Sequence, residues 1–516
     1  AKCMDKKKGL LNVSVSIGFK VLLLAINIVS RRFLIQYVGN EVNGLNSLYL
    51  SILDFLSIAE LGVGSAITFC MYKPIVAGDT NKVSALYGLF TKLYILVGCI
   101  IFVCGCALMP VLPYLAKDYE KANVNLYLTY FVMLISVVLS YFFSAKSSLI
   151  NAYKNNYITT IISSSGMLLQ CCLQIAVLIF TKSFFWYLFC RVISIMLQWL
   201  VTEIIARNKY PMIIRNKQKI DSETKQEVTK NIKAMFMHRI GGVLVNAADS
   251  IIISAFIGVV ILGKYSNYTT IVTAMMGILI LCFTPLTSVI GHMTVEEDKI
   301  TVRKYYNFFH TFNFILGIIF FLGYYAVIDD LILLFFAGNT ENDLIMAKSV
   351  SFIITLNYFI QFMRQATTLF RDATGTFYYD RWKPLFEGLL NIVLSISFVY
   401  LFGYFFGDDL AVVGVIAATI ITNLAICHIV EPYVLYKHTL MHSPKQYYVR
   451  NYLYIIIFTI SLLLMHFCLI DIENVWLRLI CNGAISLGFS FVICIFILLV
   501  NQDFRYYLKK LLQKNL

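Results

Sequence analysis

Charged residues and proline are scarce in this sequence. Asp, Glu, Lys and Arg make up 14% of its 516 residues, hydrophobic residues make up 59%, and only 8 prolines interrupt the apolar runs. The mean hydropathy of +0.77 excludes an ordinary soluble globular protein. The alternating ten-residue segments of a membrane β-barrel are missing as well. The composition therefore predicts an all-α polytopic membrane protein.

Several signatures of enzymes and of cofactor sites are also missing. The chain has no GxxxxGK[ST] nucleotide loop, no DxD pair in a sizeable soluble segment and no nucleophile beside a plausible base. Its 13 cysteines and 7 histidines show no metal-ligand spacing. We therefore expect a protein without metal, cofactor or enzymatic activity. A membrane glycosyltransferase or polymerase is the disfavoured alternative.

Long apolar runs are abundant. A helix needs roughly 20 apolar residues to cross the hydrocarbon core, where only helices satisfy their own backbone. Polar breaks divide the sequence into fourteen such runs, which predict fourteen transmembrane helices. They lie near residues 10–37, 44–70, 86–113, 123–145, 158–180, 184–206, 237–258, 263–290, 305–328, 344–370, 384–406, 410–434, 451–470 and 475–500.

The net charge of +14 follows this topology and needs no nucleic-acid partner. With a cytoplasmic N-terminus, most Lys and Arg fall in loops on the cytoplasmic side, as the positive-inside rule requires. The first apolar run lacks a signal-peptide cleavage site and is expected to be retained. An even number of spans places both termini in the cytoplasm. The basic C-terminal segment RYYLKKLLQKNL is expected to lie on the membrane surface.

A weak internal repeat divides the chain. A shift of 219 residues aligns VGNEVNGLNSLYLSI, from Val38, with IGVVILGKYSNYTTI, from Ile257. Copies separated by an even number of spans have the same orientation, which predicts two parallel six-helix lobes. The predicted domains are an N-lobe with a basic linker (1–232), a C-lobe (233–436) and a final helix pair with a basic tail (437–516). The five identities are Gly39 with Gly258, Gly44 with Gly263, Ser47 with Ser266, Tyr49 with Tyr268, and Ile52 with Ile271.

Charged residues inside spans are costly and are functional candidates by default. At roughly 100° per residue, Lys20, Asn27 and Arg31 fall on one stripe of the first span, and Arg32 points about 100° away. Asp54 lies at a similar depth beyond the next turn, so Arg32 and Asp54 are predicted to form a structural pair. An ion pair or snorkelling remains the alternative explanation for Arg31.

Comparable polar stripes occur in three other predicted spans, and together they predict one aqueous cavity. Guanidinium groups bind phosphate oxygens bidentately, so this cavity should prefer an anion. The residues added by these stripes are Gln170 and Gln174 in the fifth span, Arg191 in the sixth, and Asn357, Gln361 and Arg364 in the tenth.

Two acidic residues within spans are candidates for ion coupling. Asp249 occupies a position in the second copy close to that of Arg31 in the first, and Glu387 lies in the eleventh span. A carboxylate in a cavity can exchange a proton or a sodium ion as its access changes. A structural ion pair is the alternative for both residues.

The segment RRFLIQYVGNEVNGLNSLYLSILDFLSIAELGVGSAI, with LYGLF after a short basic loop and LGKYSNY in the second copy, resembles the Wzx-type polysaccharide flippases. These belong to the MOP superfamily, together with the MATE multidrug and toxin extruders and the lipid II flippase MurJ. The resemblance is best in spans one to three and seven to eight. It implies a V-shaped, MATE-like fold of two six-helix lobes plus two helices, which works by alternating access.

The resemblance also implies a substrate and a location. Such flippases move polyprenyl-pyrophosphate-linked oligosaccharides across the bacterial cytoplasmic (inner) membrane for O-antigen, capsule and lipopolysaccharide assembly. Other polysaccharide assembly proteins are expected partners. The expected pyrophosphate ligands are Arg31, Arg191, Arg364 and Lys20. The expected glycan ligands are Asn27, Asn357, Gln361, Gln170 and Gln174.

Two related transporters are the alternatives within the superfamily. A MurJ-like lipid II flippase should also have a groove beside spans thirteen and fourteen that reaches the cavity. A MATE-like small-molecule exporter usually has twelve spans and acidic cavity residues, which the predicted span count and the basic excess disfavour.

Overall fold

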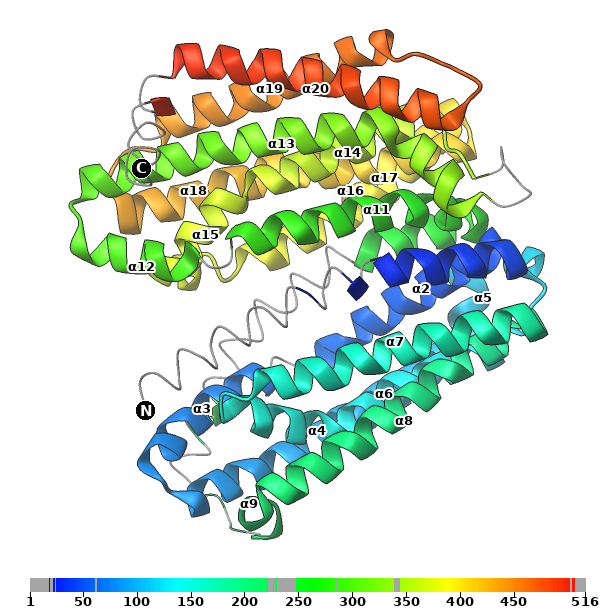
Figure 1. Ribbon diagram of the computed structural model, residues 1–516, viewed down its shortest axis with the longest axis vertical. Coiled ribbons are helices and arrows are strands. Elements are labelled where there is room, and N and C mark those ends of the chain that lie inside the picture. The colour runs from blue at the N-terminus through cyan, green and yellow to red at the C-terminus, as the bar shows by residue number, and fades with distance from the viewer. Residues whose placement is uncertain are drawn as a thin grey trace. The chain divides into compact units, whose positions relative to one another are not determined.

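Helices form the structured part of the chain in a computed structural model (Figure 1). The structure describes residues 18, 22–23, 25–60, 63–216, 218, 220, 226, 228–229, 247–283, 286–337, 344–501 and 504–505. The chain divides into two compact units, Ala1–Gly263 and Lys264–Leu516. The predicted all-α membrane fold is confirmed. The domain boundaries predicted from the sequence stay predictions.

The first unit contains long helices with polar caps. The Asp79 side chain accepts the Lys82 N–H at the start of α4 (2.9 Å), and the Asn125 side chain accepts the Leu128 N–H at the start of α6 (3.0 Å). After a helix over residues 25–38, the elements are α2 (Asn40–Leu56), η1 (Ser57–Glu60), α3 (Val63–Ala77), α4 (Thr80–Leu108), η2 (Met109–Val111), α5 (Leu112–Leu115), η3 (Tyr119–Ala122), α6 (Leu126–Ala152), α7 (Asn156–Thr181), α8 (Phe184–Lys209), α9 (Pro211–Arg215) and η4 (Ile253–Ile257).

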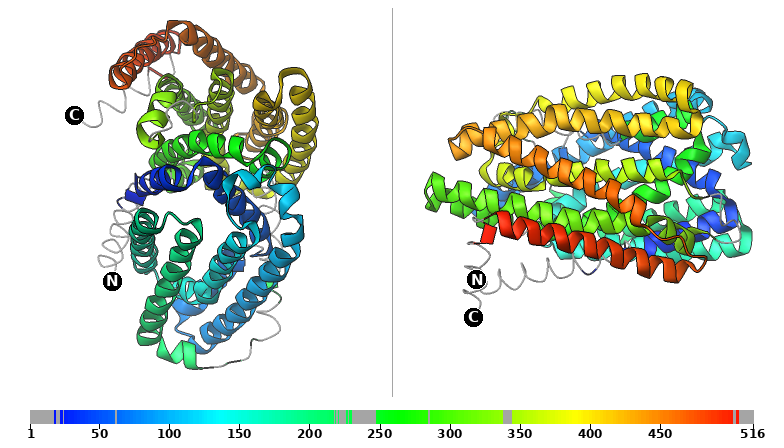
Figure 2. Two further views of the ribbon diagram at one scale, coloured as in Figure 1. Left: turned by 90° about the vertical axis from the view of Figure 1, so that its right-hand side faces the viewer. Right: turned by 90° about the horizontal axis from the view of Figure 1, so that it is seen from above.

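The second unit is organised around α13, which contacts α14, α15, α19 and α20. Figure 2 shows α19 and α20, in orange and red, beside the green α13. Its elements are α11 (Val259–Phe283), whose first turn belongs to the first unit, α12 (Leu286–Glu296), α13 (Lys299–Phe336), α14 (Lys348–Met363), α15 (Gln365–Thr374), η5 (Thr376–Tyr378), α16 (Lys383–Phe406), α17 (Asp408–Thr422), η6 (Asn423–Cys427), α18 (His428–Leu435), η7 (Tyr436–Leu440), α19 (Lys445–Cys468) and α20 (Val475–Val500).

Aromatic stacking joins three helices of this unit. The rings of Phe359 (α14) and Phe458 (α19) stack with their centroids 3.6 Å apart, and those of Phe314 (α13) and Tyr454 (α19) stack at 4.0 Å. Stacked aromatic pairs contribute about 0.5–1.5 kcal/mol beyond the area that they bury. These contacts hold α19 against the helices that carry the polar residues.

Ten helices within the described ranges are long and apolar enough to cross a membrane, and a shorter apolar helix covers Ala247–Ile257. The chain is therefore a multi-pass membrane protein, but the predicted count of fourteen is not confirmed. The predicted spans near 10–37 and 237–258 lie partly outside the described residues. The predicted span near 344–370 is divided, because α14 and α15 meet at Arg364.

The predicted repeat has a structural counterpart where α2 and α11 begin. Gly39 and Gly258 both have positive φ, at 110° and 139°, and a helix follows each directly. A positive φ of this kind is accessible to glycine at little cost, which explains why both copies carry glycine there. The equivalent tyrosines, Tyr49 and Tyr268, are both fully buried.

The first turns of α2 and α11 also lie against each other within the first unit. A Cβ atom added to Gly44 would lie 1.9 Å from the Val259 carbonyl oxygen, and one added to Gly263 would lie 2.3 Å from the Asn40 carbonyl oxygen. The two contacts are equivalent in the repeat, because a shift of 219 residues relates Gly44 to Gly263 and Asn40 to Val259. The Asn43 side chain donates a hydrogen bond to the Gly263 carbonyl oxygen at 3.2 Å. The repeated glycines therefore allow a reciprocal helix crossing.

Replacing either crossing glycine should destabilise the protein. Gly44→Ala and Gly263→Ala place a methyl group against backbone, so we expect each to cost about 1–3 kcal/mol through overpacking. Gly277→Ala is the matched control, because no atom lies within 4 Å of its Cβ position in the same α11. Thermal unfolding in detergent measures the effect. A Gly44→Ala protein as stable as the Gly277→Ala protein would contradict the crossing.

Candidate functional site

Two arginines of the first unit gather around one tyrosine. Tyr187 and Arg191 lie one turn apart on α8, and Arg31 lies on the helix over residues 25–38. Tyr187 is within electrostatic range of both guanidinium groups and of Cys171 on α7. Three helices thus meet at this tyrosine. The structure brings together two of the four residues predicted to bind an anion.

Two predicted glutamines lie at the same tyrosine. Gln174 on α7 is buried, and its Nε2 donates to the Tyr187 carbonyl oxygen at 3.1 Å. Gln170, one turn earlier and half-buried, donates to Gln174 Oε1 at 3.4 Å. We call Arg31, Gln170, Gln174, Tyr187 and Arg191 the first-unit cluster. Tyr187 shares the predicted polar stripe of the sixth span with Arg191, but no ligand role was predicted for it.

The predicted pair of Arg32 and Asp54 stays a prediction. Both side chains are exposed, and Asp54 lies within electrostatic range of Arg191. The structure therefore relates Asp54 to the first-unit cluster. An exposed carboxylate interacts only weakly with a nearby cation, because water screens the charges.

The other predicted residues of the first unit are more scattered. Asn27 is exposed, and Asp249 is half-buried on the short apolar helix Ala247–Ile257. Lys20 lies outside the described residues. The roles predicted for these three residues stay predictions.

The tenth-span stripe of the sequence is found in the second unit, on α14 and at its end. Asn357 is buried, and Gln361 Nε2 donates to its Oδ1 at 3.4 Å. Arg364 follows at the break between α14 and α15, with 22% of its side chain exposed. The three predicted residues therefore share one face, as the spacing required.

Arg364 makes a two-point contact with Glu431 on α18. Its Nη2 lies 2.6 Å from Glu431 Oε1 and its Nε 3.1 Å from Oε2, while Nη1 donates to Asn423 Oδ1 at 2.8 Å. All three guanidinium nitrogens thus have protein acceptors. The pyrophosphate role of Arg364 stays a prediction, and a ligand would have to compete with Glu431.

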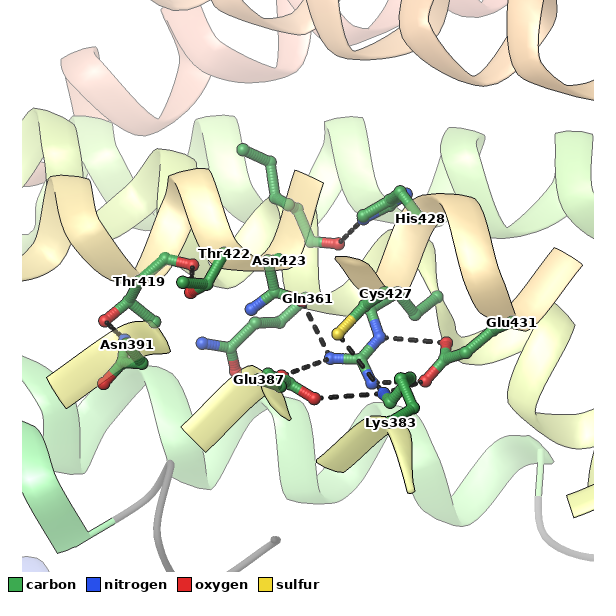
Figure 3. A network of polar contacts seen from close by, with 12 residues as sticks. Gln361, Lys383, Glu387, Asn391, Thr419, Thr422, Asn423, Cys427, His428 and Glu431 are labelled. Carbon is green, nitrogen blue, oxygen red and sulfur yellow. Dashed lines mark hydrogen bonds and ion pairs between the residues drawn. The ribbon is translucent and has the colours of Figure 1, made fainter. Parts of the chain in front are cut away.

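Further cations approach the same carboxylate. Lys383 Nζ lies 2.6 Å from Glu431 Oε1 and 3.0 Å from Glu387 Oε2, and Arg371 Nη1 lies 3.4 Å from Glu431 Oε1. Figure 3 shows Glu431, Lys383 and Glu387 converging from α18 and α16. Arg371 also pairs with the buried Asp380 at 2.9 Å. We call Arg364, Arg371, Lys383, Glu387 and Glu431 the second-unit cluster.

Arg364 and Glu387 were predicted as site residues from the sequence, whereas Lys383 and Glu431 were not assigned to a site. Lys383 and Glu387 are spaced i, i+4 at the start of α16, which was the available signal. The two predicted residues approach each other, at 3.8 Å between Arg364 Nη1 and Glu387 Oε1. The structure therefore places Glu387 in an ion-pair network.

A row of buried polar residues continues from Glu387 along one face of α16. Asn391 and Ser395 follow at successive turns and are fully buried. Asn391 Nδ2 donates to Thr419 Oγ1 on α17 at 2.9 Å (Figure 3). Among the described residues, the Asn391 Oδ1 and Ser395 Oγ atoms have no hydrogen-bond partner. A buried polar atom without a hydrogen-bond partner lowers the stability of the fold in an apolar medium.

A separate groove lies between α19 and α20, the last two helices. Its volume is about 830 Å³. The helices occupy the predicted positions of spans thirteen and fourteen. The lining residues are Lys445, Gln446, Val449, Arg450, Leu453, Tyr454, Ile457, Phe496, Ile497, Val500 and Asn501.

Solved structures with the same fold are membrane transporters. A multidrug resistance MATE family transporter of the MOP superfamily in an inward-facing conformation matches with a TM-score of 0.60 and 14% identity, covering 80% of this chain and 96% of the other. The lipid II flippase MurJ, in an inward closed conformation, matches with a TM-score of 0.64 and 13% identity, covering 93% and 98%.

A third match is a MOP superfamily transporter from Pyrococcus furiosus, whose reverse polarity of the binding pocket suggests a different function. Its TM-score is 0.54 at 14% identity, with coverage of 85% and 97%. No family profile and no curated protein sequence matches the chain. At these identities the similarity establishes the fold, which is that of the MATE and MurJ transporters.

Neutralising Glu431 should destabilise the second unit strongly. Glu431→Gln keeps the shape but leaves Arg364, Lys383 and Arg371 without their shared carboxylate. Removing one partner of a buried ion pair costs about 3–5 kcal/mol. Asp372→Asn is the control, because Asp372 pairs with the same Arg371 at 3.4 Å but is 51% exposed, and such exposed pairs contribute about 0–1 kcal/mol. Thermal unfolding in detergent should rank the two variants in that order, and equal melting temperatures would contradict the role of Glu431.

Proposed function

We propose that the protein is a lipid-linked oligosaccharide flippase of the Wzx type, and not an enzyme. It moves polyprenyl-pyrophosphate-linked glycan units from the cytoplasmic to the outer leaflet of a bacterial cytoplasmic membrane by alternating access. The observation that carries this proposal is the first-unit cluster, where Arg31 and Arg191 meet near Tyr187 beside two glutamines. The fold shared with solved transporters supports it.

The chemistry of the cluster suits such a substrate. Two guanidinium groups bind the oxygens of a pyrophosphate through charge-assisted hydrogen bonds, which are roughly twice as strong as neutral ones. The Gln170 and Gln174 amides can donate to and accept from sugar hydroxyls. Lys20, Asn27, Asn357, Gln361 and Arg364 extend the proposed binding residues, and membrane lipids and other polysaccharide assembly proteins are the proposed partners.

A lipid II flippase of the MurJ type is the second candidate. The groove between α19 and α20 meets one part of what is expected of that group, a groove beside spans thirteen and fourteen. Its connection to the cavity stays a prediction. The alignment with lipid II flippase MurJ covers 93% of this chain and therefore extends to most of its helices. Both candidates transport a pyrophosphate-linked lipid, so they share the cationic cluster and differ in the glycan.

Removing either cluster arginine should slow transport strongly without unfolding the protein. Arg31→Gln and Arg191→Gln each remove a charge that contacts the pyrophosphate, so we expect at least a tenfold slower flipping of a fluorescent polyprenyl-pyrophosphate oligosaccharide in proteoliposomes. Arg207→Gln is the control, because the Arg207 side chain is 70% exposed on the same α8 as Arg191. Normal flipping by both cluster variants would remove these arginines from the mechanism.

The same proteoliposomes separate the two candidates. A Wzx-type protein should flip the oligosaccharide substrate and leave lipid II, the peptidoglycan precursor, in place. The opposite preference would identify the MurJ-type alternative, and transport of neither substrate would contradict both.

Ion coupling is proposed for Glu387 or Asp249. Glu387 is bound to Lys383 at 3.0 Å, so its titration or ion binding would change the charge of the second-unit cluster. In vesicles with an imposed proton or sodium gradient, we expect Glu387→Gln to transport at a rate that no longer depends on the gradient. Asp249→Asn is measured in parallel. A variant that keeps the full gradient dependence excludes its residue from coupling.

A further inference from the structure

The groove between α19 and α20 has a polar end. Lys445 and Gln446 lie in the first turn of α19, Arg450 lies about one turn later, and Asn501 follows the last residue of α20. The positive N-terminus of α19 adds to the two cationic side chains at this end. An anion is therefore favoured here.

The rest of the groove is apolar and open to the surroundings of the helices. Six apolar residues line it, of which four are at least half exposed in the chain alone and Ile497 is buried. The exposed fractions are 63% for Val449, 50% for Leu453, 54% for Phe496 and 64% for Val500, and Ile457 is half-buried. Such side chains favour contact with hydrocarbon over water.

Arg450 lacks a carboxylate partner among the described residues. Its Nη2 donates to Asn307 Oδ1 on α13 at 2.7 Å, and its Nε is buried without a hydrogen-bond partner. The Arg450 side chain lines the polar end of the groove, so an anion there would supply the charged partner that the described residues do not. Lys445, which is exposed at the same polar end of the groove, supplies a second cation.

The length of the groove matches one leaflet of a bilayer. From Lys445 to Ile457, α19 rises about 18 Å at 1.5 Å per residue. One leaflet of hydrocarbon is about 15 Å thick, half of a core of about 30 Å. An amphiphile with its charge at Lys445 and its chain reaching Ile457 would therefore occupy one leaflet.

We propose that this groove binds one anionic phospholipid from the leaflet in which α19 begins. Its phosphate contacts Arg450 and Lys445, and one acyl chain lies along α19 and α20. The lipid would connect these helices to α13, because Arg450 is already bound to Asn307 there and Asn501 Nδ2 donates to Thr311 Oγ1 on α13 at 3.2 Å. This proposal does not depend on the identity of the transported substrate.

Native mass spectrometry of the full, delipidated protein tests the proposal. The probes are dioleoyl phosphatidylglycerol and dioleoyl phosphatidylcholine, which share their chains and differ in charge. We expect the protein to bind one phosphatidylglycerol about tenfold or more tightly than phosphatidylcholine, as charge-assisted contacts predict. The double variant Lys445→Gln, Arg450→Gln should lose this preference. Lys304→Gln, which removes an exposed cation on α13, should keep it.

A second variant and two competitors complete the test. Leu453→Trp keeps both cations but fills the path of the chain, so it should weaken phosphatidylglycerol binding about tenfold even if the double variant does not fold. Soluble glycerol phosphate should compete poorly. Equal affinity for the two phospholipids, or an unchanged preference in the charge variant, would overturn the proposal. So would competition by glycerol phosphate, or tighter binding of polyprenyl pyrophosphate in the same groove.

Discussion

The polar interior of the second unit depends on the charge of one carboxylate. Glu431 is 1% exposed, and Arg364, Lys383 and Arg371 all lie within 3.4 Å of its oxygens. Three cations within an apolar environment would repel one another and lose their hydration, so the structure is stable only if acids accompany them. Glu431 therefore connects α18 to the break between α14 and α15 and to α16.

Several of these contacts lie at local irregularities of the helices. Arg364 stands at the break between α14 and α15, and its Nη1 bonds to Asn423, the first residue of the π-helix η6. His428 directly follows that π-helix, and its Nε2 contacts the Ile360 carbonyl oxygen at 3.0 Å. Because a carbonyl oxygen only accepts, His428 Nε2 must carry the proton, and Nδ1 then accepts from Asn451 Nδ2 at 2.9 Å. The bond to the Ile360 carbonyl oxygen gives a backbone acceptor near the break a side-chain donor.

Helical spacing predicted most of the first-unit cluster, little of the second-unit cluster, and not how the helices meet. The fifth- and sixth-span stripes contained Gln170, Gln174 and Arg191, and the structure places them together because one face of a helix keeps its residues in line. The partners of Arg364 were missed, since Glu431 lies 67 residues away on another helix. A polar stripe is a property of one helix, whereas ion pairing between residues of different helices depends on how those helices pack. The sequence also did not predict that the tenth span divides at Arg364. The contacts that Arg364 makes there with Glu431 and Asn423 exist only in the folded chain.

The two clusters differ in how easily an anionic ligand could replace their internal acids. In the second unit, Arg364 contacts Glu431 through two nitrogens in a buried site, and an incoming phosphate would leave a buried carboxylate without its partners. In the first unit, Arg191 lies within electrostatic range of Asp54, which is exposed and can be hydrated when the arginine turns to a ligand. Replacing the internal acid by an anionic ligand therefore costs less free energy at Arg191 than at Arg364. This difference supports the proposal that the first-unit cluster is the anion site.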